Sequence, residues 1–376
     1  MSVAGDWAAP TGSVERATLT LGREIGAGAT STVREARKDG RLYFYKEYGK
    51  PQRHAVRLGR LIGWRDQLRP GERRFLDDHG AWPLYAVTAG DALTGFLMNP
   101  APEEFWADMH SGRHTVELQH LLHGRNARAG GVAGPPLAER LDLLADLAEL
   151  LRLLDRHSIV YGDIGPKNVL WTLHDTPRVY LIDCDNARPA DLPGAASGAA
   201  MPKNGSWRDP YLRPGEWPDL NSDRYALAMF CFRVCFGSTA EVRAGDEEIL
   251  VPDDAPEIPG LGELTYRGLR APERRPSPDR WQDAIAASGR PAPGEPAGTR
   301  PIRAPSARSG PARQARPPQA ARSQAARSQS ARSQAPRSRP QAPARQEPMS
   351  PFIAAAVVIL GLAAVVLVVL LLTHRL

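Results

Sequence analysis

The first hundred residues contain short apolar runs separated by polar turns, a pattern typical of strands. One run reaches a glycine-rich turn from Gly26 to Ser31, and a strand pattern continues from there through Val33. Asp39-Gly40 then separates two strand-like runs, and a short Asp-Gly turn in this position predicts a hairpin. We expect strands at 19–25, 42–46, 84–87 and 94–98, and a helix at 52–68, where the apolar residues have helical spacing.

The following two hundred residues favour helices. One helix should begin after Pro135-Pro136, because proline suits the first helical turn and an apolar stripe follows. Another, residues 224–236, is apolar on nearly every face and should be buried, so burial of its Cys231 and Cys235 is favoured over metal binding or a disulfide bond. We also expect strands at 159–161, 169–171 and 179–182, and a last helix at 279–287. Strands first and helices after predict an α+β fold.

Residues 352–372 contain no charged or strongly polar side chain. A helix of that length, with a rise of about 1.5 Å per residue, spans about 31 Å and matches the hydrocarbon core of a bilayer. We therefore predict one transmembrane helix over residues 351–373, followed by a short tail, residues 374–376.

The segment before this helix, residues 291–350, is rich in Pro, Ala, Arg, Gln and Ser, a low-complexity composition that predicts a disordered linker. It carries eleven Arg and two Glu, so the overall charge of +6 originates in the linker and the preceding residues are slightly acidic. Nucleic-acid binding is therefore disfavoured, whereas contact with anionic lipids is expected. Arginine beside the span also predicts a single-pass, tail-anchored protein of the cell membrane with its N-terminal part in the cytoplasm. Residues 1–17 are expected to be disordered.

Three oxygen-bearing side chains lie close to predicted strands in the second half of the chain. Asp163 and Asn168 are five residues apart on a loop between two strands, and Asp183 ends the strand at 179–182. Phosphoryl transfer from ATP needs a carboxylate to orient the attacking hydroxyl, and an amide and a second carboxylate to hold Mg²⁺. Alone, each residue would be read as a capping or turn residue; the set predicts a phosphoryl-transfer site.

A second group of candidate residues lies upstream, in the pattern Gly26-x-Gly28-x-x-Ser31-x-Val33. Glycines between two strands let backbone N–H groups approach phosphate oxygens. Lys46 follows in an otherwise apolar strand, where an unpaired buried ammonium group would be costly. We therefore expect an anion to meet it, the alternative being an edge-strand lysine that reaches solvent.

Together these segments resemble the signature set of protein kinases: the glycine-rich loop, the lysine of the third strand, the catalytic loop and the metal-binding Asp. The resemblance covers residues 18–290 and is to the eukaryotic-like (Hanks-type) Ser/Thr protein kinases of bacteria. It implies a two-lobed kinase-like fold, with an N-lobe at 18–100 and a C-lobe at 101–290, and an enzyme that uses ATP with Mg²⁺ or Mn²⁺. It also implies that Asp163 and Lys46 are catalytic, that Asn168 and Asp183 hold the metal, and that the nucleotide is bound by Gly26, Gly28, Ser31, Val33, Lys46 and Met98.

Two further matches lie away from this chemistry. Asp223 resembles the Asp that begins the buried αF helix of kinases and braces the catalytic loop. Arg275 resembles the C-lobe Arg that pairs with a Glu after the activation segment. Gly215 stands where the family has that acid, and Glu216 follows it.

The chain also departs from the family pattern. Gly162 replaces the Arg before the catalytic Asp, which implies independence from phosphorylation of the activation loop. Gly165 replaces the lysine that helps to neutralise the γ-phosphate, and Lys167 occupies a different register. Cys184 replaces the Phe of the Asp-Phe-Gly motif.

The helix after Lys46 offers no Glu for the usual ion pair; Asp66 is the closest acid by spacing and Glu72 a poorer candidate. Together with Gly165, this leaves open a membrane-tethered pseudokinase that binds nucleotide without catalysis. The Gly-Asp-x-x-x-x-Asn and Ile-Asp-x-Asp patterns also resemble aminoglycoside-kinase-like small-molecule phosphotransferases. The matches at Asp223 and Arg275 favour the protein-kinase interpretation.

Overall fold

The computed structural model describes residues 12–28, 30–52, 56–109, 112–122, 134–194, 205–288 and 299–302. All of them belong to one compact unit, Met1–Gly310. The predicted transmembrane helix and tail lie outside the described residues, as does the predicted linker apart from residues 299–302. Within the described ranges, no helix is both long and apolar enough to cross a bilayer.

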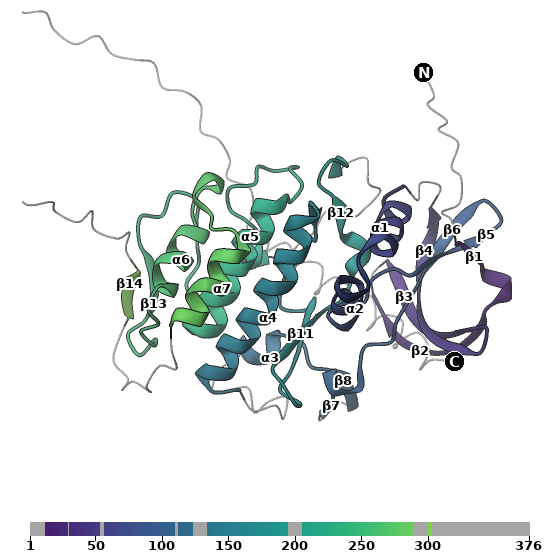
Figure 1. Cartoon of the computed structure of the whole chain (residues 1–376), viewed down its shortest axis with the longest axis horizontal. Helices are drawn as coiled ribbons and strands as arrows, with labels where there is room; N and C mark the ends of the chain where they lie inside the picture. Colours follow the sequence, from purple (N-terminus) through teal and green to yellow (C-terminus); the bar gives the residue numbers. More distant parts are fainter. Residues whose placement is uncertain are drawn as a thin grey trace, which may run out of the picture. The chain divides into compact units, whose positions relative to one another are not determined.

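The first part of this unit is a six-stranded sheet in the order β1-β5-β6-β4-β3-β2 (Figure 1). Its strands are β1 (Val14–Glu15), β2 (Thr20–Ala27), β3 (Ser31–Lys38), β4 (Arg41–Gln52), β5 (Tyr85–Ala89) and β6 (Ala92–Met98). The predicted hairpin between β3 and β4 is present, and its turn residues Asp39 and Gly40 both have positive φ, 49° and 77°. That backbone conformation suits an Asp-Gly hairpin turn.

The sheet begins earlier in the chain than predicted. Val14 and Glu15 form β1 and pair in parallel with Val87 and Thr88 of β5, within the segment expected to be disordered. Val14 is buried, and the Glu15 carboxylate accepts a hydrogen bond from Thr88 Oγ1. A two-residue strand with one buried side chain carries too little periodicity to be recognised from sequence.

Two helices follow β4. The first, α1 (Val56–Gln67), lies within the predicted helix and buries Leu58 and Ile62 in a cluster with Phe96 of β6. The second, α2 (Pro70–Asp78), was not predicted, because most of its residues are polar and Leu76 is its one buried residue. We refer to the sheet with α1 and α2 as the N-lobe.

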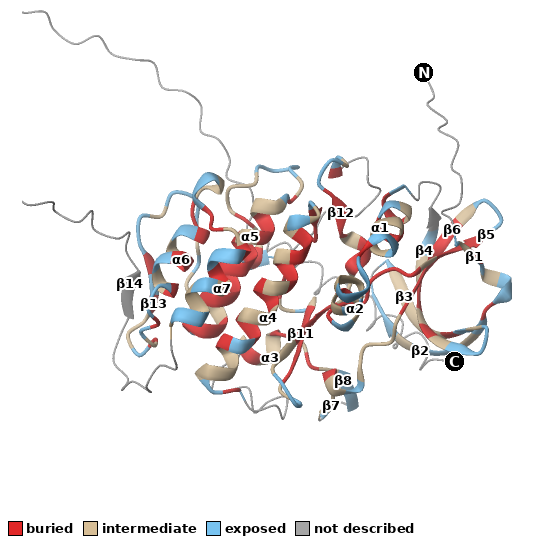
Figure 2. Ribbon diagram, in the orientation of Figure 1, coloured by how far each residue is buried: buried red, intermediate tan, exposed pale blue. Residues whose placement is uncertain are grey.

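The C-lobe comprises the described residues from 103 to 288, together with β14. Its helices are α3 (Gln119–Leu122), α4 (Leu137–Arg156), α5 (Leu220–Phe230), α6 (Leu261–Gly268) and α7 (Pro278–Ala287). Its short strands are β7 (Trp106–Met109), β8 (Gly112–Thr115), β9 (Ile159–Val160), β10 (Val169–Thr172), β11 (Arg178–Leu181), β12 (Arg188–Pro189) and β13 (Ile249–Pro252). Helix α4 packs against α5 and α7, and Figure 2 shows buried residues concentrated along α4 and α5. A sheet followed by helices is the predicted α+β arrangement and fits a kinase-like fold.

Helix α5 is positioned by a capping box. The Asp219 side chain accepts a hydrogen bond from Ser222 N, and Ser222 Oγ accepts one from Asp219 N. Beyond its end the chain continues as a π-helical turn, Cys231–Cys235. Both cysteines are buried, as predicted, and neither forms a disulfide bond.

Strand β14 (Thr299–Ile302) pairs antiparallel with β13. These four residues fall inside the predicted linker and correct that prediction locally. Their partner strand lies far back in the chain, so the sequence of the linker alone gave no sign of the pairing. For the rest of the linker, disorder stays a prediction.

Candidate functional site

The loop between β9 and β10 brings Asp163 and Asn168 together. Asn168 Nδ2 donates to the backbone oxygen of Asp163 at 3.0 Å, and the buried Asp163 carboxylate accepts a hydrogen bond from Asn186 Nδ2 at 3.3 Å. Asn186 ends the turn that follows Asp183. These bonds therefore connect two of the three segments that the sequence predicted to converge.

Asp223, near the start of α5, holds the chain just before Asp163 in place. Its two carboxylate oxygens accept hydrogen bonds from Tyr161 N and Gly162 N, each at 2.8 Å. Burial raises the pKa of Asp223 to about 7, although the two backbone donors act in the opposite direction. Gly162 has φ of 75°, and a Cβ there would lie 3.3 Å from Pro218 Cβ, so glycine suits this position. The brace predicted for Asp223 is present.

Asp183 follows β11 and precedes the turn Cys184–Asn186. It adopts a left-handed backbone conformation, φ 58° and ψ 32°, which is uncommon outside glycine and clusters at functional sites. Its side chain is 46% exposed, so its carboxylate is accessible to a ligand. Cys184, at the position of the family's Phe, is instead fully buried in the C-lobe core.

Lys46 of β4 meets two carboxylates from this turn. Its Nζ lies 2.6 Å from Asp185 Oδ1 and 3.1 Å from Asp183 Oδ1, and Tyr48 Oη donates to Asp185 Oδ2 at 3.2 Å. Burial alone would lower the pKa of Lys46, but the two carboxylates raise it above its ordinary value. The lysine is therefore a cation at neutral pH, and the anion expected beside it is present.

That anion does not come from the helix after β4, which corrects the expectation drawn from the family. Asp66 is exposed and pairs with its neighbour in sequence, and Glu72 belongs to α2, where it lies 3.5 Å from Arg156. The charged side chain that α1 buries is a cation, Arg57. The spacing from Lys46 along the chain made Asp66 the closest candidate for an ion pair with the lysine. In the structure, however, Asp66 lies in the last turn of α1 and is exposed to solvent.

The glycine-rich turn lies close to Lys46. Gly26 pairs with Val33 across the β2–β3 hairpin, and Val33 pairs in turn with Lys46 across β3 and β4. Gly28 N donates to Ser31 O at 2.8 Å, which closes the turn. A Cβ added at Gly26 would meet no atom within 4 Å, so the space beside this glycine is open to a ligand.

Apolar residues of both lobes meet near Met98 at the end of β6. Met98 is buried in a cluster with Leu170 of β10, and Val33 and Ile182 pack against that cluster. Val33 and Met98, which the sequence predicted as nucleotide contacts, therefore share one apolar surface with residues flanking Asn168 and Asp183.

The donor atoms at this site fit a divalent cation. Asn168 uses its amide N–H to bind the backbone of Asp163, a bond that does not engage its amide oxygen, and Asp183 offers an accessible carboxylate. Magnesium prefers such hard oxygen donors and keeps several waters or phosphate oxygens as further ligands. Sequence reasoning missed Asp185 and Asn186, although the run Asp183-Cys-Asp-Asn186 was the available signal.

A cavity of about 690 Å³ lies beside the loop between β9 and β10. Gly165, Lys167 and Asn168 line it together with Trp207 and Arg233. Its volume is in the range of ligand sites in proteins. Because Asn168 borders it, the cavity is the candidate site for a phosphoryl acceptor.

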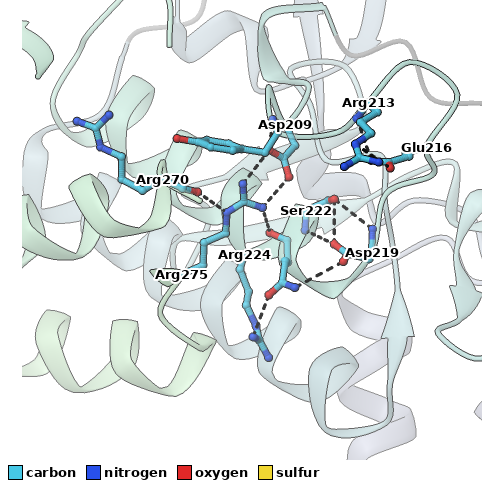
Figure 3. Close-up of polar contacts among 10 residues, drawn as sticks. Asp209, Arg213, Glu216, Asp219, Ser222, Arg224, Arg270 and Arg275 are labelled. Carbon is cyan, nitrogen blue, oxygen red and sulfur yellow. Dashed lines mark hydrogen bonds and ion pairs between the residues drawn. The ribbon is translucent and has the colours of Figure 1, made fainter. Parts of the chain in front are cut away.

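Arg275 forms a buried ion pair in the C-lobe (Figure 3). Its guanidinium donates to both oxygens of Asp209, at 2.6 and 2.8 Å, and also to the backbone oxygens of Arg270 and Asn221. The family predicts this Arg to pair near Glu216, but Figure 3 shows Glu216 apart from it, beside Arg213. The partner is Asp209, six residues before the position where the family has its acid.

Comparison with known proteins gives two matches. Residues 47–213, somewhat under half of the chain, match the phosphotransferase enzyme family known as APH. The chain is also 26% identical over 279 residues to the serine/threonine-protein kinase PknF of Mycobacterium tuberculosis and to that of Mycobacterium bovis. The alignment covers 71% of this chain and 52% of each kinase, so the chain spans about half the length of the curated relatives it matches. Both matches support a phosphotransferase.

Proposed function

We propose that this chain, which is a divergent member of the protein-kinase-like family, is an ATP-dependent Ser/Thr protein kinase. The observation that carries the proposal is a continuous network of side-chain bonds. Lys46 binds Asp183 and Asp185, the same turn binds Asp163 through Asn186, and Asn168 binds the Asp163 backbone. Groups suited to phosphates, metal and acceptor hydroxyl thus belong to one site.

The proposed roles follow from the chemistry of each group. Asp163 orients the acceptor hydroxyl and accepts its proton. Lys46 and the N–H groups of the turn from Gly26 to Ser31 bind nucleotide phosphates, and Val33 and Met98 contact the adenine. Asn168 and Asp183 hold Mg²⁺ or Mn²⁺, which neutralises charge on the phosphate oxygens.

Two observations favour a protein acceptor. The similarity to the mycobacterial Ser/Thr kinases extends well beyond the segment that matches the phosphotransferase family. In addition, the loop brace at Asp223 is a C-lobe feature that the protein-kinase resemblance implies. Arg275 is paired with an acid, as that resemblance also implies, but the acid is Asp209 and lies at a different position from the family's Glu.

A small-molecule acceptor is the second candidate, and the APH family match favours it. The cavity beside the catalytic loop is large enough for such a molecule. Its charge, however, does not suit a polycationic aminoglycoside. The described lining includes two cations, Lys167 and Arg233, against one acid, Glu241, which is itself paired with Arg243.

The test is transfer of labelled γ-phosphate from ATP with Mg²⁺ or Mn²⁺ by the purified full chain. Acceptors are the chain itself, a general protein substrate, aminoglycosides and choline-like alcohols. We expect labelling of protein, and a loss of about 10²- to 10⁴-fold in Asp163→Ala with nucleotide binding retained in calorimetry. Transfer to small alcohols alone would support the second candidate.

A third outcome concerns a pseudokinase, motivated by Gly165 and the absent helix Glu. Nucleotide binding by the wild-type chain without transfer to any acceptor would support a non-catalytic scaffold. Transfer unchanged in Asp163→Ala would remove the role assigned to that carboxylate.

The C-terminal segment supports a further part of the proposal. The apolar residues 352–372 would anchor the chain in the cell membrane, with the arginine-rich linker beside anionic lipids and the kinase lobes in the cytoplasm. Alkaline extraction of membranes should leave the full chain in the pellet. A chain ending at residue 350 should be released.

A further inference from the structure

The two carboxylates that bind Lys46 differ in their surroundings. Asp185 Oδ1 is the closer to Nζ, at 2.6 Å against 3.1 Å for Asp183 Oδ1. The Asp185 side chain is 6% exposed, whereas that of Asp183 is 46% exposed. Asp183 can therefore turn to a ligand from solvent, while Asp185 is held inside the protein.

Asp185 is held by residues of one strand. Lys46 and Tyr48 are two residues apart on β4, so their side chains lie on the same face of the sheet. Lys46 binds one oxygen of Asp185 and the Tyr48 hydroxyl binds the other. Each carboxylate oxygen of Asp185 thus accepts a hydrogen bond from a side chain of β4. The buried carboxylate in turn holds the ammonium group of Lys46 in place.

Helix α1 supplies no competing anion. Asp66 is its single carboxylate, and it is exposed beside Arg65. The buried charge of α1 is the guanidinium of Arg57, whose positive charge acts on the Tyr48 phenol. A cation in this place cannot form an ion pair with Lys46.

We propose that Asp185 is the residue that positions Lys46 for the nucleotide phosphates, in place of a carboxylate on helix α1. The inference rests on the proposed nucleotide-binding function of the site. Asp183 then serves the metal and Asp185 serves the lysine. Lys46 lies on β4 and Asp185 on the turn after β11, so neither residue belongs to α1. A displacement of α1 therefore leaves the Lys46–Asp185 pair intact, and the site forms without a movement of that helix.

The test compares Asp185→Asn and Asp185→Glu with Asp66→Asn in the full chain. Asp66→Asn is the matched control, because it removes the one carboxylate that α1 could offer. ATP affinity is measured by calorimetry in the presence of EDTA and again with Mg²⁺. A lysine that has lost its anchor binds phosphates less well with or without metal, so we expect about a tenfold weaker affinity for Asp185→Asn under both conditions. Asp185→Glu should recover part of it, and Asp66→Asn should match the wild type.

Kinetics supply the second readout. In Asp185→Asn the KM for ATP should rise and kcat should fall, together lowering kcat/KM about a hundredfold, because a misplaced phosphate ligand disturbs the reacting geometry. Circular dichroism checks that the variant is folded. A purely structural role would lower the folded fraction and leave the KM for ATP unchanged, and that result would overturn the proposal.

Two other results would also overturn it. Weaker ATP binding in Asp185→Asn only when Mg²⁺ is present would assign Asp185 to the metal. A larger loss in Asp66→Asn than in Asp185→Asn would return the lysine partner to α1. Wild-type protein that binds ATP but transfers no phosphate would remove the proposed kinase activity while leaving the binding comparison valid; wild-type protein that binds no ATP would remove both.

The pairing itself is tested without nucleotide. A double-mutant cycle with Lys46→Met and Asp185→Asn, followed by thermal unfolding, measures the coupling between the two side chains. Coupling is expected; additive effects would overturn the proposal even if the chain proves to be an active kinase.

Discussion

Among the residues that the structure describes, the buried ion pairs of Arg275 and of Lys46 have different functions. In the C-lobe, Arg275 and Asp209 have side chains 0% and 3% exposed. The guanidinium donates to four acceptors and lies over the rings of Tyr211 and Tyr225. In the N-lobe, Lys46 shares its ammonium group between one buried and one accessible carboxylate.

The two pairs differ in whether they leave a polar group available to a ligand. The donors of Arg275 are directed at protein acceptors, so this pair ties α5 and the segment around residue 209 together and has no capacity for a ligand. The Lys46 cluster holds more acceptor capacity than one ammonium group can satisfy, because Asp183 keeps an accessible carboxylate. A saturated pair stabilises a fold, whereas an unsaturated cluster can bind a substrate.

Arg275→Met should give the largest loss of stability. It leaves the Asp209 carboxylate buried without a cation, and breaking a buried pair in this way costs about 3–5 kcal/mol. Chemical denaturation of the full chain measures the free energy of unfolding. The double variant with Asp209→Asn should lose less than the sum of the single variants, and strict additivity would contradict the comparison.

Lys46→Met should destabilise less, by about 1–3 kcal/mol, because Asp183 remains exposed to water and Asp185 keeps the Tyr48 hydroxyl. Phosphate transfer should nevertheless fall by at least about a hundredfold. A loss of stability equal to that of Arg275→Met would mean that the Lys46 cluster is mainly structural.

His79 offers a pair that titrates. Its Nε2 lies 3.0 Å from Asp146 Oδ1 and its Nδ1 lies 2.7 Å from Phe75 O. Burial acts to lower the pKa of His79, but the bond to Asp146 raises it overall. Because the pKa is higher in the folded than in the unfolded state, the stabilisation is complete below about pH 6.5 and is lost as the pH rises through the folded-state pKa.

We therefore expect His79→Asn to lose about 1 kcal/mol of unfolding free energy at pH 5.5, and the gap from wild type to shrink at higher pH. His174→Asn is the matched control, because His174 lies in an exposed pair with Asp175. Unfolding of both variants across this range tests the assignment; a gap for His79→Asn that is constant with pH would contradict it.

Glu216→Gln should have the smallest effect. Glu216 stands next to the position where the family has the partner of Arg275, but it is exposed and lies beside Arg213. Its loss should change the unfolding free energy by no more than about 0.5 kcal/mol. A loss comparable with that of Arg275→Met would show that Glu216, and not only Asp209, supports the C-lobe.

Much of the fold and of the site could be predicted from the sequence, since hydrophobic periodicity and turn residues act locally. The β3–β4 hairpin, helix α1 and the buried helix that contains Cys231 were each indicated by their own residues. The same is true of the loop that holds Asp163 and Asn168. Strand β1, helix α2 and strand β14 were missed because their short or polar sequences depend on partners elsewhere in the chain.

The sequence by itself determined which chemical groups this protein can bring to a site: one lysine in an apolar strand, glycines in the preceding turn, and Asp163, Asn168 and Asp183 on loops. Only the tertiary structure decided how they are paired. Asp185 is 139 residues from Lys46 along the chain, and Asp209 is 66 residues from Arg275. The partner of a buried charge is whichever group the packed chain brings within about 3 Å, and spacing along the sequence does not encode that distance.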